Sequence, residues 1–383
     1  MSRSKIQTAF DFSYEEYAGT SHVSDVQRKA AYDIMACHTE KCGCNISICE
    51  ECGHQDIHYN SCRNRNCPNC QAVLKEIWID ARKSEVIDGA YFHIVFTIPH
   101  ELNPLVYNNQ KLLYSLLHKC AAQTILELAA DRKYLGAAPA IIQVLHTWGQ
   151  TLSYHPHIHA IVSGSGLAPD GKMRFSGDRF FIPIHVIMKK FRGKFLALLQ
   201  QLRDDEELTF AGECKHLKNT YEWNCFRDSL YSKDWCPFIK ETFNGFGNAI
   251  EYLGRYSNRI AITNTRIQSV SKEKTSFSAK DYRTGKQIIV RLDTKEFVRR
   301  LLMHVLPSGF QKIRYYGLLN NRSKSKNLKI IFTLQRHRKF KSMYQEMPMD
   351  ELLMAVWNYD IHKCPCCGKS SLKPSGRVFR KRE

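Results

Sequence analysis

The sequence has no apolar run long enough for a membrane-crossing helix, which needs about 20 consecutive apolar residues. Its first residues, Met-Ser-Arg-Ser-Lys-Ile-Gln, also lack the apolar core of a secretory signal peptide. These two absences predict a soluble, cytoplasmic protein and argue against a membrane-embedded or secreted one.

Acidic residues are scarce relative to basic ones. Asp and Glu number 37 against 56 Lys and Arg, so the formal net charge is +19. A solvated surface explains a few surplus charges, but an excess of this size indicates a polyanionic partner, above all nucleic acid. The hydrophobic content of 43% argues against a disordered chain, and 383 residues suffice for two or three domains.

Cysteine, by contrast, is abundant. The chain has 15 cysteines, and in an intracellular protein they indicate metal binding rather than disulfides. Two Cys-x2-Cys pairs, Cys49 with Cys52 and Cys67 with Cys70, are separated by fourteen residues. This spacing predicts one tetrahedral zinc with four thiolate ligands. Since the surrounding segment has few large apolar residues, the metal would supply its folding energy.

Enough ligands remain near these pairs for a second zinc. The candidates are Cys37, Cys42, Cys44, His54, His58 and Cys62. Spacing does not select four of them, and interleaved pairing of the two Cys-x2-Cys pairs is an open alternative. A third pair, Cys364 with Cys367, is half of a zinc ribbon. Either a partner pair elsewhere in the chain completes it, or it binds no metal.

Basic residues in two regions are candidates for DNA contact. Arg63 and Arg65 stand between the cysteine pairs, in the run Y-N-S-C-R-N-R-N-C-P-N-C-Q, where bound metal would hold them in place to contact phosphates and bases. Basic and aromatic residues also mix over 311–317 and 322–329, which suits single-stranded DNA. A solvated basic surface is the alternative for 322–329.

A histidine-rich stretch over residues 154–167 alternates polar and apolar positions, which is the period of a half-buried strand. His157 and His159 are two residues apart, so both imidazoles would leave the same face. Their Cα atoms would be roughly 6–7 Å apart, close enough for one divalent ion to sit between the rings. Two surface histidines on an edge strand would show the same pattern.

The preceding strand, predicted over residues 140–152, supplies candidates for a third ligand. If the two strands form a tight hairpin, Gln150 lies opposite His157 and Trp148 lies opposite His159, and opposite residues share a face. Gln150 is therefore the first candidate and His146 the second. His155 shares that face as well, although it stands close to the turn.

Two tyrosines further along are candidate nucleophiles. Tyr252 and Tyr256 are four residues apart and would lie on one face of a helix, with Arg255 and Arg259 close to that face and able to contact DNA. Tyrosines in this arrangement are usually packing residues. Beside a metal-binding histidine pair, however, a phenolate can attack phosphorus when a metal polarises the phosphodiester and cations stabilise the charge.

The remaining patterns predict a protein that contains both helices and strands. Strand formers fill residues 91–99, a hairpin is expected over 276–292, and helical periodicity recurs over 23–35, 72–86, 104–130, 191–202 and 294–306.

Taken together, these motifs resemble a known family. H-P-H-I-H, then Y-L-G-R-Y and R-I-A-I-T-N-T-R-I, resemble the two-tyrosine HUH transposases of rolling-circle insertion sequences, and the cysteine-rich run resembles the transposase zinc-binding domain that precedes that core. The resemblance implies an α+β fold, in which an antiparallel sheet with packed helices forms the HUH nuclease core. It predicts a zinc-binding domain over 1–88, the nuclease core over 89–268, and a basic region over 269–383 that completes the core and contacts DNA.

The resemblance also implies a chemistry. His157 and His159 would hold Mg²⁺ or Mn²⁺, and Tyr252 and Tyr256 would cut single-stranded DNA and form 5′-phosphotyrosine links. One or two zinc ions would be structural, and the partner would be transposon ends and target DNA in the bacterial nucleoid. Two alternatives remain: a replication initiator or relaxase with the same chemistry, and a non-enzymatic zinc-dependent DNA-binding protein. A metallohydrolase of small molecules would leave the net charge unexplained.

Overall fold

The computed structural model describes residues 3–177, 182–235, 238–240, 250–251, 254, 261–281, 284–335 and 340–380. Within these residues the protein is α+β, with three antiparallel sheets and helices packed against them, as the sequence predicts. No helix in the described ranges is long and apolar enough to cross a membrane.

The largest sheet forms the centre of the molecule. Its strands are β3 (Tyr91–Thr97), β4 (Ala138–Trp148), β5 (Tyr154–Leu167), β7 (Phe238–Lys240) and β11 (Ile313–Gly317), in the order β11-β4-β5-β3-β7, and β6 (Met173–Phe175) pairs with β5. β5 lies between β4 and β3 and is buried along almost its whole length. The histidine-rich stretch is therefore an interior strand and not an edge strand.

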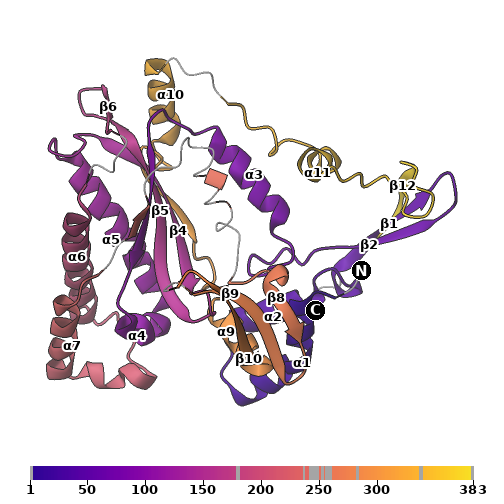
Figure 1. Cartoon of the computed structure of the whole chain (residues 1–383), viewed down its shortest axis with the longest axis horizontal. Coiled ribbons are helices and arrows are strands. Elements are labelled where there is room, and N and C mark those ends of the chain that lie inside the picture. The colour runs from indigo at the N-terminus through magenta and orange to yellow at the C-terminus, as the bar shows by residue number, and fades with distance from the viewer. Residues whose placement is uncertain are drawn as a thin grey trace.

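Helices cover one face of this sheet (Figure 1). They are α4 (Asn103–Asn108), α5 (Gln110–Ala130), α6 (Ile184–Asp204) and α7 (Thr220–Ser232). The short 3-10 helix η2 (His100–Leu102) precedes α4, and η3 (Gly212–Lys218) lies between α6 and α7. The core between sheet and helices includes Phe96 and Ile158 from the strands and Leu117 and Phe191 from the helices. This core is formed by the alternate residues that point away from the histidine face.

A second unit combines the N-terminal helices with a segment from the last third of the sequence. The helices α1 (Lys5–Thr20) and α2 (Asp25–Ala36) pack with α9 (Thr294–Met303) and with β8 (Ile267–Val270), β9 (Lys274–Lys280) and β10 (Gln287–Asp293), next to η4 (Asn264–Arg266). Each N-terminal helix starts with a capping box, formed by Ser4 with Gln7 and by Ser24 with Gln27. Consecutive domains were expected from the sequence, whereas this unit is assembled from distant segments.

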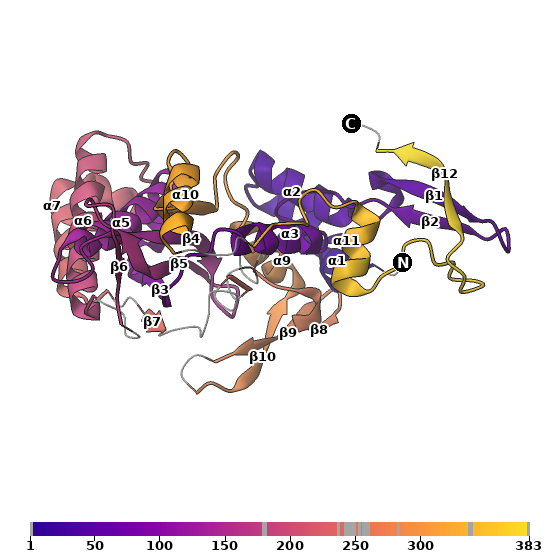
Figure 2. The same cartoon turned by 90° about the horizontal axis from the view of Figure 1, so that it is seen from above.

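A third unit projects from the other two and is seen at the right of Figures 1 and 2. It contains η1 (Glu40–Cys42) and the sheet β12-β1-β2, made of β1 (Gly43–Cys49), β2 (Gln55–Tyr59) and β12 (Leu372–Phe379). The helix α3 (Ala72–Lys83) leads from the cysteine-rich region back toward the central sheet. Beyond β11, α10 (Lys324–Leu334) and α11 (Met349–Trp357) lie on the path that carries the chain to β12.

Candidate functional site

Three histidines meet on one face of the central sheet. His157 and His159 leave the same face of β5, as the alternation predicts, and His146 comes from the neighbouring strand β4. The Nε2 atoms of His157 and His159 are 3.1 Å apart, and one nitrogen from each of the three rings lies within 4.8 Å of the others. We call these residues the histidine triad.

The third member of the triad differs from the first candidate of the sequence analysis. β4 ends at Trp148, and residues 149–153 form the connection, so His146, and not Gln150, is the partner of His157. Gln150 is exposed in that connection, and its carbonyl oxygen accepts a hydrogen bond from Arg266. A tight hairpin would have placed Gln150 on the strand; the longer turn shifts the pairing by four residues, which favours His146, the second candidate.

Hydrogen bonds orient the triad. The Nδ1–H of His157 donates to the carbonyl oxygen of His155 at 2.6 Å, which leaves the Nε2 lone pair of His157 facing His159. A fourth histidine, His93 on β3, has its Nε2 atom 2.7 Å from Nδ1 of His159, and the two ring planes are parallel to within 2°, with centroids 5.0 Å apart. His93 therefore orients His159 in the way that outer partners orient metal ligands.

His93 was not singled out from the sequence. A signal existed, because His93 is a polar residue inside the run Y-F-H-I-V-F-T, which is otherwise made of strand formers and is buried in the structure. Only the pairing of β3 with β5 shows that it lies on the histidine face.

Burial keeps His157 and His159 neutral. His146 is 2% exposed, and His157 and His159 are each 9% exposed. Burial lowers the pKa of His157 to about 3 and lowers that of His159 well below its usual value, with the nearby His157 and His93 adding to the second shift. A neutral imidazole has a lone pair for a metal, so the three rings form a set of donors that fits a divalent transition metal.

The candidate nucleophiles Tyr252 and Tyr256, and the candidate DNA contacts Arg255 and Arg259, lie outside the described residues. Three residues beside them are described, and they meet the helix α3.

The contacts with α3 are close. An ideal Cβ on Gly254 would lie 2.4 Å from the Ile79 side chain, so only glycine fits there without a shift of Ile79. Ile250 is fully buried in the same apolar cluster as Ile79. Glu251 accepts a hydrogen bond from Lys83 at 2.9 Å. The helix that leaves the cysteine-rich region therefore packs on the chain next to both tyrosine positions.

Eight of the described cysteines form two clusters. One contains Cys37, Cys62, Cys67 and Cys70, and the other contains Cys49, Cys52, Cys364 and Cys367. Within each cluster, all four sulfur atoms lie within 4.8 Å of one another. Such a set of thiols has the number and spacing that a tetrahedral zinc needs.

The expected quartet of Cys49, Cys52, Cys67 and Cys70 is therefore replaced by an interleaved arrangement. The two Cys-x2-Cys pairs stand at different ends of the β1–β2 hairpin and its following loop, so each finds a different partner pair. His54 belongs to neither cluster among the described residues; its carbonyl oxygen accepts the backbone N–H of Cys49 at 2.9 Å.

The first cluster closes the loop that follows β2. Cys37 is the residue directly after α2, and its sulfur accepts the backbone N–H of Cys62 at 3.5 Å. Hydrogen bonds from the thiols of Cys62, Cys67 and Cys70 lower the pKa of Cys37 well below its usual value. The cluster therefore favours a thiolate, which is the form that binds metal.

The predicted arginines of this loop have different roles. Arg63 is exposed, and its backbone has a positive φ of 57°. Arg65 is also exposed, but it crosses to the loop after α9, where its guanidinium donates to the carbonyl oxygens of Pro307 at 2.6 Å and of Phe310. Arg65 thus joins the cysteine-rich region to the core.

A cleft of about 710 Å³ lies between the cysteine-rich region and the central sheet. Its lining includes Arg65 and Trp78 from one side, and Trp148, Lys312, Tyr315 and Arg322 from the other. Lys312 Nζ lies 5.0 Å from the centre of the Trp148 ring, and Trp148 stacks on His146 at 4.7 Å. The basic and aromatic cleft therefore ends beside the histidine triad.

Comparison with known proteins identifies relatives along most of the chain. A family model described as "Putative transposase" matches residues 140–329, and one described as "Transposase zinc-binding domain" matches residues 9–98. The "Putative transposase y4qJ" of Sinorhizobium fredii is 35% identical over 363 residues, which cover 91% of this chain and 89% of the relative. The "Transposase for insertion sequence element IS801" of Pseudomonas savastanoi pv. phaseolicola is 27% identical over 354 residues, 90% of this chain and 82% of the relative. No solved structure matches significantly.

Proposed function

Because this chain belongs to the family of insertion-sequence transposases with an N-terminal zinc-binding domain, we propose that it moves DNA by metal-dependent cutting and rejoining of single strands. The observation that carries the proposal is the histidine triad: three buried imidazoles, two from the strand β5 that the family resemblance marks as catalytic and one from the neighbouring strand β4. DNA as the partner agrees with the net charge of +19.

His146, His157 and His159 would hold the catalytic metal. A divalent Mg²⁺ or Mn²⁺ ion polarises a phosphodiester and stabilises the charge that develops on its oxygens. Because three imidazoles suit a transition metal better than Mg²⁺, which prefers oxygen ligands, Mn²⁺ is the better fit to this set. His93 would hold the His159 ring in place.

Tyr252 and Tyr256 would be the nucleophiles. The phenolate oxygen attacks the phosphorus, the bond from phosphorus to the 3′-oxygen breaks, and the departing oxygen takes up a proton as a free 3′-hydroxyl. The tyrosine keeps the 5′-phosphate as an ester, so a 3′-hydroxyl can later attack it and restore a phosphodiester without an external energy source. Two tyrosines allow a second strand to be cut before the first is released.

The cleft offers a path for the strand. Aromatic side chains stack on bases while cations follow phosphates, and the lining supplies both: Trp78, Trp148 and Tyr315 with Lys312 and Arg322. A strand in the cleft would pass Trp148, whose ring lies on His146, and so reach the triad.

The alternatives differ in observable ways. A replication initiator or relaxase would share the chemistry but act at a plasmid origin, and the relatives, which are named as transposases, favour the transposase. A non-enzymatic DNA-binding protein would bind single strands and leave them intact.

A covalent-adduct assay tests the proposal. The purified protein is incubated with labelled single-stranded element ends and Mn²⁺, and a denaturing gel shows whether protein and DNA become linked. The wild type should form the adduct. The His157→Ala, His159→Ala double variant should form none while it still binds DNA. His185→Ala, on the exposed side of α6, is the matched control. Binding without any adduct in the wild type would contradict the proposed chemistry.

A further inference from the structure

The two ends of the sequence meet in one small sheet. β12 pairs with β1 in antiparallel register, from Gly43 opposite Phe379 to Cys49 opposite Leu372. At the start of β1 the strands approach closely, because a Cβ on Gly43 would lie 2.3 Å from the carbonyl oxygen of Val378. The C-terminal segment therefore has a defined place on the N-terminal hairpin.

Four sulfur atoms meet at the other end of this pairing. Cys49 Sγ lies 3.6 Å from Cys367 Sγ, and Cys52 Sγ lies 3.7 Å from Cys364 Sγ. Four sulfurs bound to a tetrahedral zinc at about 2.3 Å would be roughly 3.8 Å apart. A disulfide would bring two of them to about 2.05 Å. The spacing therefore matches a shared metal and not a pair of disulfides.

The two halves of the cluster have the same local structure. In each half a Cys-x2-Cys pair is followed by a glycine, Gly53 or Gly368, whose backbone N–H donates to the carbonyl oxygen of the first cysteine at 2.9 Å. Both glycines have a positive φ, 71° and 74°, and a Cβ on either would meet nothing within 4 Å. The glycines are thus needed for the turn itself, which presents both sulfurs of the pair to one point.

Apolar burial does little to hold this end of the chain. Of the described residues 340–380, which we call the C-terminal arm, only Leu352, Cys364 and Leu372 are buried. An exposed ion pair between Lys369 and Glu51 adds little, because solvent screens it. A segment with so small a core needs another source of stability, and bound metal is a common one.

We propose that Cys49, Cys52, Cys364 and Cys367 bind a structural zinc that fastens the C-terminal arm to the β1–β2 hairpin. Cys364 and Cys367 lie outside the range 9–98 that matches the zinc-binding domain and outside the range 140–329 of the second match. This site shares no cysteine with the cluster of Cys37, Cys62, Cys67 and Cys70. The proposal does not depend on the proposed cleavage chemistry.

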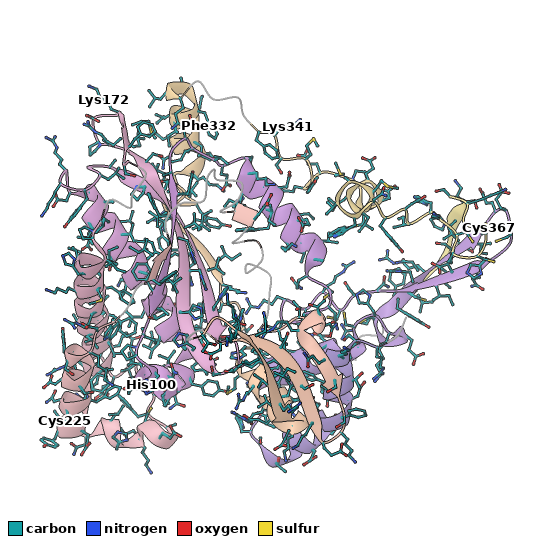
Figure 3. The ribbon with its side chains drawn as sticks, viewed as in Figure 1. His100, Lys172, Cys225, Phe332, Lys341 and Cys367 are labelled. Atoms are coloured by element: carbon teal, nitrogen blue, oxygen red, sulfur yellow. The ribbon has the colours of Figure 1, made fainter. Side chains whose placement is uncertain are left out.

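Figure 3 shows what the zinc would connect. Cys367 lies at the far end of the projecting unit, while Lys341, at the start of the C-terminal arm, lies near α3 and the central part of the molecule. The zinc would thus close a second connection between the core and the β1–β2 hairpin, in addition to α3.

Zinc content measured on the full-length protein tests the site. The protein is purified without chelator, and metal is counted by mass spectrometry of the native chain. Wild type should carry two zinc ions. The Cys364→Ser, Cys367→Ser variant should carry one. Cys366→Ser is the matched control, because Cys366 is exposed between the two ligands and belongs to neither cluster, and this variant should keep two. The Cys67→Ser, Cys70→Ser variant should lose the other ion.

Limited proteolysis gives a second readout. The Cys364→Ser, Cys367→Ser variant should be cut within the C-terminal arm roughly tenfold faster than wild type, since local opening controls cleavage there. The Cys366→Ser variant should be cut at the wild-type rate. Two ions in the Cys364→Ser, Cys367→Ser variant would overturn the proposal. So would a wild type whose single ion is lost from the Cys67→Ser, Cys70→Ser variant, and this comparison decides even if the first variant does not fold.

Discussion

At the scale of single residues, the orientation of the ring nitrogens determines which histidines form the triad. His157 donates through Nδ1 to a backbone carbonyl, so its Nε2 is left for a ligand, and His146 reaches the same point from β4. Gln150, although close in sequence, lies in the connection between the strands. The residue types and their positions in the sequence would not have shown that His146, and not Gln150, lies next to His157.

Alanine substitutions at His146 and Gln150 test which of the two residues binds the metal. His146→Ala should reduce Mn²⁺-dependent adduct formation by at least about 100-fold, since loss of an outer partner alone costs roughly 10–100-fold. Gln150→Ala should keep wild-type activity, because the backbone carbonyl that binds Arg266 remains. Mn²⁺ affinity, measured by calorimetry, should follow the same order. Equal losses in both variants would contradict the assignment of His146.

Two buried histidines outside the triad predict how stability depends on pH. Burial lowers the pKa of His118 on α5 to about 3, and that of His304 to about 4. Both stay neutral in the folded protein, while the unfolded chain takes up protons below pH 6.5. Their contribution is therefore complete above pH 6.5 and is lost as the pH falls toward the folded pKa values.

At pH 5 each of these histidines should lower the free energy of unfolding by roughly 2 kcal/mol relative to pH 7. Urea unfolding of wild type and His118→Leu at both pH values measures this change. The variant should show a pH-dependent loss smaller by about that amount. His185→Leu, on an exposed position of α6, should show the wild-type loss. The same loss in His118→Leu as in wild type would mean that His118 is not the residue that titrates.

At the scale of elements, α3 links the cysteine-rich region to the chain beside Tyr252 and Tyr256. Its contacts are the packing of Ile79 on Gly254 and Ile250 and the ion pair between Lys83 and Glu251. A Cβ at Gly254 would lie 2.4 Å from the Ile79 side chain, so Gly254 and Ile79 are closely packed.

A double variant tests this packing. Gly254→Ala should reduce adduct formation, because its Cβ would lie 2.4 Å from Ile79 and push the segment away from α3. Adding Ile79→Ala makes room and should restore most of the activity. The control is Gly193→Ala on α6, where a Cβ meets nothing within 4 Å, and this change should leave activity intact. If the second substitution gave no recovery, packing against α3 would not be the cause.

At the scale of the whole molecule, basic side chains line the cleft between the cysteine-rich region and the core. Arg65 closes one side by binding the carbonyls of the loop after α9, and the half-buried Lys312 lies against Trp148, where desolvation lowers its pKa to about 7. The cleft thus depends on contacts between segments far apart in sequence.

The salt dependence of DNA binding locates the path of the strand. Arg322→Gln removes an exposed charge of the cleft, so it should weaken binding of single-stranded DNA and reduce the slope of log K against log salt by about 0.7. Arg377→Gln on β12, away from the cleft, is the matched control and should leave the slope unchanged. Fluorescence titrations between 50 and 200 mM salt, roughly the range over which such slopes are resolved, measure it. An unchanged slope for Arg322→Gln would place the strand elsewhere.

The sequence by itself determined the features that depend on local spacing. Alternation along β5 places His157 and His159 on one face, and each Cys-x2-Cys spacing brings the two sulfurs of the pair into one cluster. These follow from strand and turn geometry over a few residues. The family resemblance and the α+β class could be recognised from the same motifs.

Only the tertiary structure decided which of these local pieces meet. The length of the connection after Trp148 sets the register that brings His146, and not Gln150, to His157. Cys49 and Cys367 are 318 residues apart in sequence, yet their sulfurs are 3.6 Å apart. Sequence spacing does not predict contacts between residues this far apart, because strand pairing and packing across the whole fold determine which residues meet.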